Sequence, residues 1–202
     1  MSGLAMLITR FGARVQGTDS TESSITNTLH KEGMNISYIQ DGSSITEEID
    51  LIVYSAAIPP DHPEIVAADE CGIPIVSYAQ MLGMVQSQHT SVCIAGTHGK
   101  STTVSILSSI LLHTQLNPSF IVGANCNQIG GSSRVGSSVI PTGVHNGKQG
   151  VLVSESCEFN RSFHDHNPTI ALINNIEEDH LDYYSSLDDI IESFKGFAMN
   201  IP

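Results

Sequence analysis

The segment 96–101 (Gly-Thr-His-Gly-Lys-Ser) has the residue types of a phosphate-binding loop. It follows the apolar run 91–95, which is typical of a buried strand, and precedes a pattern typical of a helix. Glycines let backbone N–H groups converge on a phosphate, and the helix N-terminus adds partial positive charge. We expect Lys100 to contact the β- and γ-phosphates of a nucleotide and the Ser101 hydroxyl to bind Mg²⁺. Strict Walker A spacing requires a glycine where Ile94 stands, so an ordinary strand-to-helix turn is the alternative.

Acidic residues and a histidine follow two further apolar runs. The segment 155–158 (Glu-Ser-Cys-Glu) comes directly after 151–153, and the segment 174–184, which contains His180, comes after 170–173. The carboxyl ends of parallel strands meet at one edge of a sheet, where open α/β sheets bind ligands. Carboxylates there can complete a magnesium shell, and an imidazole can bind a divalent cation. Either segment alone could be a solvated loop, but with the glycine-rich loop they predict one phosphate and metal site.

Two positions nearer the N-terminus have the residue types of a second ligand site. Asp19 follows the predicted strand 14–17, where a Rossmann-like unit places the acid that binds a ribose. It could equally cap the next helix. The small residues 55–57 (Ser-Ala-Ala) end another predicted strand, and they suit either the close approach of a ligand or simple packing.

Apolar runs alternate with helical patterns along the chain, which predicts an α/β fold with mostly parallel sheets. The polar segment 86–90 lacks periodicity, so we place a boundary there between domains 1–88 and 89–202. The glycine- and serine-rich segment 126–150 is expected to be a loop-rich insertion. The expected helices span 1–12, 18–31, 63–70, 102–113 and 187–197, and the expected strands span 14–17, 35–39, 49–55, 73–76, 91–95, 120–123, 151–153 and 170–173.

At both of its ends, the sequence lacks elements that a domain of the predicted kind would contain. A Rossmann-like unit opens with a strand and a glycine-rich turn, whereas this sequence starts within a helical pattern. It also stops when the second predicted sheet has just added its later strands. We therefore expect a fragment: a Rossmann-like N-terminal domain whose first strand is missing, followed by part of a P-loop-type, nucleotide-binding α/β domain, which the family resemblance described below implies to be ATP-binding.

The composition is acidic and contains enough apolar residues for a core. The 202 residues include 8 Lys and Arg against 21 Asp and Glu, a net charge of −13, and 40% are hydrophobic. This balance excludes non-specific binding to nucleic acid or to an anionic membrane surface, since both need basic patches. No apolar run reaches the about 18 residues that span a bilayer. The apolar opening segment 1–8 has no charged region before it, so a signal peptide is not expected.

Four cysteines are spread over the chain without a C-x-x-C pair. We interpret them as reduced core residues of a cytoplasmic protein, with two disulfides as the alternative. They are Cys71, Cys93, Cys126 and Cys157. His164 and His166 have the spacing of a ligand pair, and we interpret them as surface residues.

Taken together, these motifs resemble the Mur ligases, the cytoplasmic family that builds the peptide of peptidoglycan. The segment 95–103 (Ala-Gly-Thr-His-Gly-Lys-Ser-Thr-Thr) is similar to the family's ATP loop. The segment 173–182 (Ile-Asn-Asn-Ile-Glu-Glu-Asp-His-Leu-Asp) is similar to its Thr-Asn-Ile-Glu-x-Asp-His-x-Asp motif. Further similarities lie at 1–5, 17–19, 54–58 and 61–64, so the resemblance covers nearly the whole chain.

The resemblance implies roles for individual residues. Lys100 would bind the γ-phosphate and Ser101 a Mg²⁺ ion. Glu158 matches the glutamate of the family's Asp-Glu-Ser-Asp and would bind metal, and His180 matches the histidine that holds a second Mg²⁺. The implied catalytic residues are Lys100, Glu158 and His180; the implied nucleotide contacts are Gly96, Thr97, His98, Gly99, Lys100, Ser101, Thr102 and Asn175; and the implied UDP-sugar contacts are Asp19, Ser55 and Ala56.

The loop with His98 is similar to that of the branch that joins L-alanine to UDP-N-acetylmuramate. The implied reaction transfers the γ-phosphoryl group of ATP to the carboxylate, and the amine of L-alanine then attacks the acyl phosphate. The family's third domain, which carries the amino-acid site, lies outside this sequence, so the chain alone is expected to be inactive. Two departures stand out: 157–160 (Cys-Glu-Phe-Asn) replaces the acidic motif, and Tyr78 stands where many members have Arg.

Two other functions stay open at this point. A murein-tripeptide recycling ligase shares the Gly-Thr-His-Gly-Lys loop, although the segment 175–182 fits the alanine-adding branch better. A nucleotide-binding module without ligase activity is the alternative of a different class. Release of ADP in the presence of an amino acid would separate an enzyme from such a module.

Overall fold

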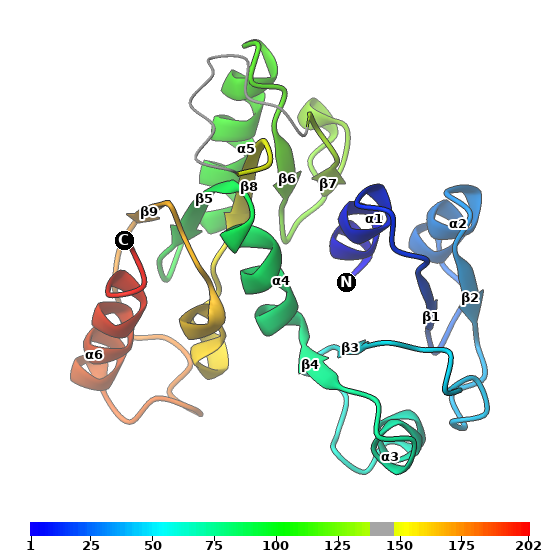
Figure 1. Ribbon diagram of the computed structural model, residues 1–202. Coiled ribbons are helices and arrows are strands. Elements are labelled where there is room, and N and C mark those ends of the chain that lie inside the picture. The colour runs from blue at the N-terminus through cyan, green and yellow to red at the C-terminus, as the bar shows by residue number, and fades with distance from the viewer. Residues whose placement is uncertain (138–147) are drawn as a thin grey trace. The chain divides into compact units, whose positions relative to one another are not determined.

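The apolar runs form short parallel strands in the structure, a computed structural model that describes residues 1–137 and 148–202 (Figure 1). The chain divides into two compact units, Met1–Met81 (unit 1) and Leu82–Pro202 (unit 2). Helix α4 (Tyr78–Ser87) contains the point of division. No helix within the described ranges is long and apolar enough to cross a membrane.

Unit 1 combines three helices with two pairs of parallel strands. Its elements are α1 (Ser2–Arg10), β1 (Gln16–Thr18), α2 (Ser24–Lys31), β2 (Asn35–Ser37), β3 (Ile52–Tyr54), α3 (Pro63–Glu70) and β4 (Ile75–Ser77). Strand β1 pairs with β2, and β3 pairs with β4. A small core contains Leu29, Met34 and Ile36. Helix α2 begins after Ser23, whose hydroxyl accepts a backbone N–H in a capping box, so the cap is Ser23 and not Asp19.

The strands in the described part of unit 2 form one five-stranded sheet. After α4, its elements are β5 (Thr90–Ala95), α5 (Lys100–Leu112), β6 (Ser119–Ile121), η1 (Asn127–Ile129), β7 (Ser133–Arg134), β8 (Val151–Glu155), η2 (Phe159–Asp165), β9 (Ile170–Ile173) and α6 (Leu187–Ala198). The strand order is β7-β6-β8-β5-β9, and every pairing is parallel except that of β6 with β7. The prediction of an α/β fold with a mostly parallel sheet is confirmed.

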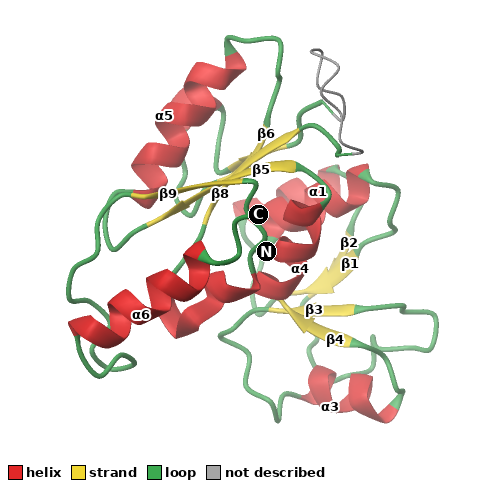
Figure 2. Cartoon of the chain, turned by 60° about the vertical axis from the view of Figure 1, so that its left-hand side comes forward, coloured by secondary structure: helices red, strands yellow, loops and turns green. Residues whose placement is uncertain are grey.

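Alternate residues of the central strand β5 enter two different cores. Ile94 lies in a cluster with Val104 of α5, whereas Cys93 and Ala95 lie in a cluster with Phe194 of α6. Successive side chains of a strand point to opposite faces of a sheet, so α5 and α6 cover the two faces. Figure 2 shows these helices on opposite sides of the strands.

The polar segment 86–90 is not an irregular linker. Its first two residues end helix α4, and its last residue begins β5. Gln86 is fully buried: its side-chain amide donates to Ser154 Oγ (3.0 Å), and its Oε1 accepts the N–H of Asn167 (3.0 Å). A polar side chain can be buried where its hydrogen bonds are made within the protein, so the polarity of this segment does not by itself make it a loop.

The predicted loop-rich insertion 126–150 contains two short elements, η1 and β7. Residues 138–147 of this prediction lie outside the described part of the chain. The element η2 was also not predicted. Asn160 and Arg161 within it have φ of 54° and 53°, so its residues follow no helical periodicity.

The cysteines and the histidine pair occupy environments that differ from those expected. All four cysteines are free thiols: Cys93 is buried and Cys126 packs partly buried against a core cluster, so the expectation of core residues is wrong only for the exposed Cys71 and Cys157. The surface interpretation holds for His164, but it is wrong for His166, which is 3% exposed. Nδ1 of His166 lies 2.8 Å from Ser156 Oγ, and this hydrogen bond satisfies the buried ring.

Candidate functional site

The glycine-rich loop lies between the end of β5 and the start of α5, and its backbone requires glycine. Gly96 has a φ of 135° and Gly99 a φ of 80°, values that residues with a Cβ rarely adopt. A Cβ on Gly96 would lie 3.0 Å from the Cβ of Asn174 and 3.1 Å from its backbone nitrogen. The loop therefore packs closely against the segment that follows β9.

Backbone and side-chain hydrogen bonds join this loop to the segment after β9. Thr97 donates its N–H to the carbonyl of Asn175 (3.1 Å), and its hydroxyl accepts the N–H of Glu177 (2.9 Å). Oδ1 of Asn175 accepts the N–H of His98 (2.8 Å), and Nδ2 of Asn174 donates to the carbonyl of His98 (3.2 Å). The loop is thus held in shape by residues about 80 positions away in the sequence.

Lys100 and Glu158 form an ion pair at the base of this loop. Nζ of Lys100 lies 3.0 Å and 2.8 Å from the two carboxylate oxygens of Glu158. It also donates to the carbonyls of Gly96 (2.6 Å) and Thr97 (3.2 Å). Glu158 is 2% exposed, and a buried carboxylate is stable only where a partner compensates its lost hydration. Both charges are therefore fixed where the strand ends meet.

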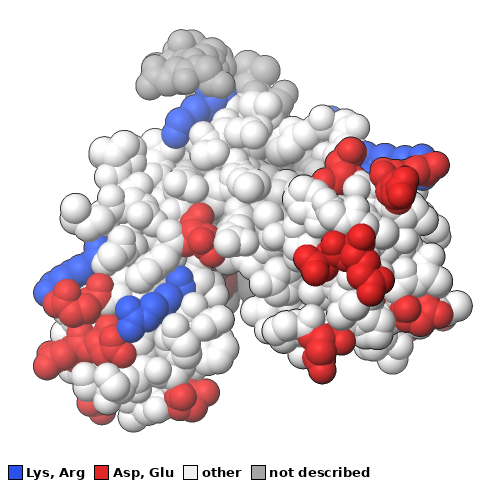
Figure 3. Space-filling view, turned by 60° about the horizontal axis from the view of Figure 1, so that its bottom comes forward, with Lys and Arg blue, Asp and Glu red and all other residues white. Residues whose placement is uncertain are grey.

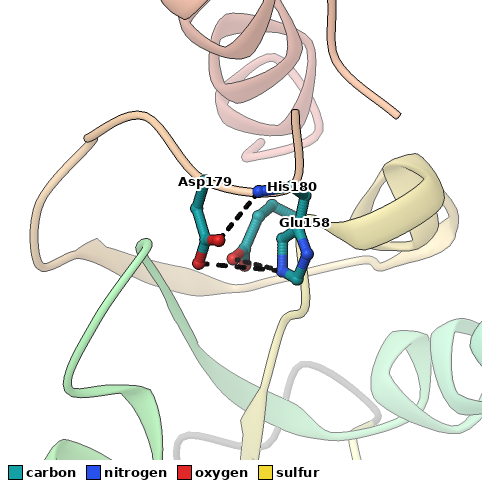
Figure 4. A group of neighbouring side chains, drawn as sticks. All are labelled: Glu158, Asp179 and His180. Carbon is teal, nitrogen blue, oxygen red and sulfur yellow. Dashed lines mark hydrogen bonds and ion pairs between the residues drawn. The ribbon is translucent and has the colours of Figure 1, made fainter. Parts of the chain in front are cut away.

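Glu158, Asp179 and His180 form a group that could hold a metal ion. Each offers one ligand atom, and these atoms lie within 4.8 Å of one another. Nε2 of His180 is 3.8 Å from Oε1 of Glu158 and 3.9 Å from Oδ2 of Asp179. Figure 4 shows both carboxylates and the imidazole directed toward one another. Two carboxylate oxygens and an imidazole nitrogen are a donor set that suits a divalent cation, so these residues fit a bound metal.

The strand register explains why these residues meet. Ile94 of β5 is paired with Glu155 of β8, and Ala95 is paired with Ile173 of β9. The carboxyl ends of the three neighbouring strands therefore lie side by side, as the strand-end rule predicts. Beyond β9, a φ of 52° at His180 turns the chain.

The other predicted residues of unit 2 are close to this site in the fold. Ser101 and Thr102 lie in the first turn of α5, with Ser101 half-buried and Thr102 exposed. The side chain of Asn175, for which a nucleotide contact is predicted, binds the backbone of His98 through both Oδ1 and Nδ2. Asn175 therefore shapes the loop whatever else it contacts.

The predicted residues of unit 1 are in a more open environment. Asp19 is exposed just beyond β1, and its Oδ1 accepts the N–H of Thr21 (3.4 Å). Ser55 is half-buried and Ala56 exposed just beyond β3. Among the described contacts, none joins Asp19 to Ser55 or Ala56. The structure brings together the predicted residues of the phosphate and metal site but does not link those of the second site.

Asp179 is the member of the metal group that the sequence argument did not select. It stands beside His180 in the acidic segment, and its Oδ1 accepts the backbone N–H of His180 (2.8 Å). A carboxylate adjacent to a candidate histidine was the signal available in the sequence. Near Glu158, burial raises the pKa of the Cys157 thiol, although the residue as a whole is exposed, so this position is neutral where the family motif has an acid.

Known families match both units. Residues 1–90 match the family described as "Mur ligase family, catalytic domain", and residues 94–202 match the "Mur ligase middle domain". The chain belongs to the Mur ligase family. This agrees with the resemblance of its loop and acidic segments, and it confirms that resemblance at the level of the family.

Relatives of this Mur ligase chain include enzymes named UDP-N-acetylmuramate–L-alanine ligase. The chain is 42% identical to the one from Lachnospira eligens over 203 residues and 42% identical to the one from Clostridium novyi over 203 residues. Both alignments cover 100% of this chain and 42% of the relative. The chain thus spans less than half the length of these curated relatives.

Solved structures of Mur ligases have the same fold. The UDP-N-acetylmuramate–alanine ligase of Thermotoga maritima superposes with a TM-score of 0.81 at 25% identity, over 100% of this chain and 45% of that one. A Neisseria ligase for UDP-N-acetylmuramate and L-alanyl-gamma-D-glutamyl-meso-diaminopimelate superposes with a TM-score of 0.85 at 27% identity, over 100% of this chain and 65% of that one. The likeness confirms the α/β fold and is consistent with a Rossmann-like unit 1.

Proposed function

We propose that this chain is part of an ATP-dependent ligase that joins L-alanine to the carboxylate of UDP-N-acetylmuramate in peptidoglycan precursor synthesis. The observation that carries the proposal is the meeting of Lys100, Glu158 and His180 at three adjacent strand ends. Relatives 42% identical over the whole chain bear the name of this activity, which supports the choice of substrates. The proposal includes a domain boundary at 86–90, with domains 1–88 and 89–202.

ATP would bind with its phosphates on the loop 96–101. The backbone N–H groups at the N-terminus of α5 supply donors, and Lys100 supplies a full positive charge. The γ-phosphoryl group would pass to the substrate carboxylate, leaving ADP. The amine of L-alanine would then attack the acyl carbon, lose a proton and expel phosphate, so that an amide bond replaces the acyl phosphate. Catalysis of this kind depends mainly on positioning two anions and neutralising their charge.

Ser101 of α5 would bind a Mg²⁺ ion through its hydroxyl, and Glu158, Asp179 and His180 would hold a second Mg²⁺ ion. The ions, when bound, neutralise phosphate charge during the transfer. Their ligands include two acids, which is compatible with a chain of net charge −13 because the positive charge is needed only locally. Figure 3 shows one face of the molecule, where acidic side chains outnumber basic ones and no broad basic patch is seen.

The UDP-sugar would bind to unit 1 through Asp19, Ser55 and Ala56. Asp19 follows a parallel strand, where an acid can accept hydrogen bonds from a ribose. The small side chain of Ala56 leaves space for a ligand beyond β3. Both nucleotide substrates are water-soluble metabolites, so the proposed place of action is the cytoplasm.

A ligase assay on the complete gene product tests the proposal. The protein is incubated with ATP, Mg²⁺, UDP-N-acetylmuramate and L-alanine, and both ADP and the conjugate are measured. We expect ADP and conjugate in equal amounts. Binding of ATP without release of ADP for any amino acid would contradict the ligase proposal and favour a nucleotide-binding module.

A murein-peptide ligase is the second candidate, because a ligase of that kind superposes on the chain with a TM-score of 0.85. The same assay separates the two candidates when L-alanine is replaced by the tripeptide L-alanyl-gamma-D-glutamyl-meso-diaminopimelate. Conjugation of the tripeptide and not of L-alanine would overturn the first choice of acceptor.

A further inference from the structure

Tyr184 contacts the main chain of both Glu158 and His180. It is 2% exposed and lies in the loop between β9 and α6. Its backbone N–H donates to the carbonyl of His180 (2.9 Å). Its hydroxyl donates to the carbonyl of Glu158. One buried residue thus links two ligands of the candidate metal group that are 22 positions apart in the sequence.

We propose that Tyr184 is a positioning residue that sets the separation of Glu158 and His180 for a divalent cation. The proposal rests on the metal site of the proposed function and adds a residue that neither the family motif nor the metal group includes. Partners of metal ligands that fix their orientation commonly control affinity as strongly as some ligands do. Tyr184 acts on the backbone that carries the two ligands, and it does not touch the ion.

The surroundings of Tyr184 hold its ring in one place. The guanidinium of Arg161 lies 5.5 Å from the ring centroid and forms an ion pair with Asp189 of α6 at 2.6 Å. The ring of Tyr183 meets it edge-on at 5.0 Å. The hydroxyl has a second partner, Ser193 Oγ of α6, at 3.2 Å. A ring fixed on several sides carries its hydroxyl at a fixed distance from its own backbone, which a flexible side chain could not do.

The turn that follows Glu158 fixes the position of the Glu158 carbonyl, which accepts the hydrogen bond from the Tyr184 hydroxyl. Asn160 and Arg161 have φ near 54° and 53°, so the chain reverses sharply after the carboxylate. The carbonyl of Glu158 accepts the N–H of Arg161 (2.9 Å) in addition to the hydroxyl of Tyr184. This carbonyl keeps a partner if the hydroxyl is removed, so the change to phenylalanine leaves no buried acceptor without a hydrogen bond. The variant is therefore expected to fold.

The test is the affinity for Mn²⁺ alone, measured by electron paramagnetic resonance of the free ion, in the 202-residue chain and its Tyr184→Phe variant. We expect the dissociation constant to rise about tenfold, the size of effect seen when partners of metal ligands are removed. In the complete gene product, the Mg²⁺ concentration for half-maximal rate should rise, while the rate at saturating Mg²⁺ stays close to that of the unchanged protein.

Ser193→Ala is the matched control. It removes the other partner of the hydroxyl but leaves the contact with Glu158, so Mn²⁺ affinity should stay unchanged even if the thermal unfolding midpoint falls in both variants. Equal Mn²⁺ affinity in Tyr184→Phe and the unchanged chain would overturn the positioning role. An equal loss of Mn²⁺ affinity in Tyr184→Phe and Ser193→Ala would also overturn it, since equal losses indicate a general destabilisation of the fold.

Glu158→Gln separates the failure of this proposal from that of the metal site. If this variant loses Mn²⁺ affinity and Tyr184→Phe does not, the metal site is supported and the positioning role of Tyr184 is wrong. If the unchanged chain binds no Mn²⁺, both the metal site and the positioning role are wrong. If Tyr184→Phe weakens Mn²⁺ binding in a protein that forms no conjugate, the positioning role stands and the proposed ligase function falls.

Discussion

The two units contain candidate nucleotide sites that differ in how far their residues are fixed by the protein itself. In unit 2, Lys100 contacts a carboxylate and two carbonyls, and the loop before it is hydrogen-bonded to the segment after β9. In unit 1, Asp19 is exposed and its carboxylate contacts only near neighbours among the described residues. The site of unit 2 is held in place by contacts between distant segments of the chain. The candidate residues of unit 1 are positioned only because they follow two strands.

The difference follows from what each site is proposed to bind. Phosphates and metal ions carry concentrated charge, and groups that stabilise such charge act best when they are held in place beforehand. Sugars and bases present hydroxyls and ring edges, which exposed loop residues can meet as the ligand arrives. Substitutions should therefore have large, local effects in unit 2 and smaller effects in unit 1.

Lys100→Ala is expected to have the largest effect. Turnover of the complete gene product should fall on the order of a thousandfold, since a charge that stabilises the transferred phosphoryl group is lost. Binding of UDP-N-acetylmuramate, measured by calorimetry, should be unchanged because that ligand is assigned to unit 1. Lys31→Ala, at an exposed lysine of unit 1, is the matched control and should keep full turnover. Loss of UDP-sugar binding in Lys100→Ala would contradict the assignment of the two sites to different units.

The acid stability of unit 2 should depend on His166. Burial lowers the pKa of this histidine from 6.5 to about 4. The unfolded chain binds a proton there below about pH 6.5, while the folded chain does so only near pH 4, so stability is complete above pH 6.5 and decreases as the pH falls to 4. The difference corresponds to about 3 kcal/mol.

His166→Asn isolates this dependence because an asparagine amide can replace Nδ1 as the partner of Ser156. Urea unfolding between pH 7 and pH 4 should show a flatter decline for the variant. His113→Asn, at an exposed position of unit 2, should follow the unchanged chain. Identical pH slopes for His166→Asn and the unchanged chain would show that His166 does not control the decline.

Gly96→Ala and Gly17→Ala compare a glycine just beyond β5 in unit 2 with a glycine in the middle of β1 in unit 1. A Cβ at Gly96 meets three atoms of the segment after β9 at 3.0 to 3.2 Å, and its φ of 135° is unfavourable for alanine. We expect a loss of about 2 kcal/mol in unfolding free energy, together with weaker ATP binding. At Gly17 the nearest atom, Ile36 Cδ1, is 3.8 Å away, so that variant should be close to neutral. Equal unfolding energies for both variants would remove the contrast between the units.

His180→Ala should have the smallest of these effects. One ligand of three is removed, so the Mg²⁺ concentration for half-maximal turnover should rise about tenfold. The measurement is a magnesium titration of the ligase rate, with His113→Ala as the control. A titration curve that matches that of the unchanged protein would remove His180 from the metal site.

Much of the fold could be predicted because local signals agreed with the packing. Helix α3 has the predicted bounds, since Pro63 marks its start and Gly72 its end. The strands of unit 2 were predicted from short apolar runs, which fits a sheet covered on both faces. Helix α4 was not predicted, although its buried residues Ala79, Leu82 and Val85 have helical spacing. The burial of Gln86 could not be predicted, because it depends on a hydrogen bond to Ser154, 68 positions away.

The meeting of Lys100, Glu158 and His180 could be predicted from one topological rule, together with the family resemblance that selected Glu158. The interlocking of Thr97 and Asn175 could not, because it depends on the conformations of two loops. Tyr184 was also out of reach. An aromatic residue near a motif is usually part of the core, and only the structure identifies what its hydroxyl contacts.

The register of β9 against β5 has a consequence for how this protein can vary. Ile170 and Leu172 are largely exposed, so many residues of similar shape should be accepted there. A single inserted or deleted residue in the strand would instead displace Asn174 and everything after it by about 3.3 Å and exchange the faces of the side chains. Hydrogen bonds of 2.8 to 3.2 Å to the glycine-rich loop would not survive such a shift. Related sequences should therefore differ in the amino acids of β9 but not in the length of the strand.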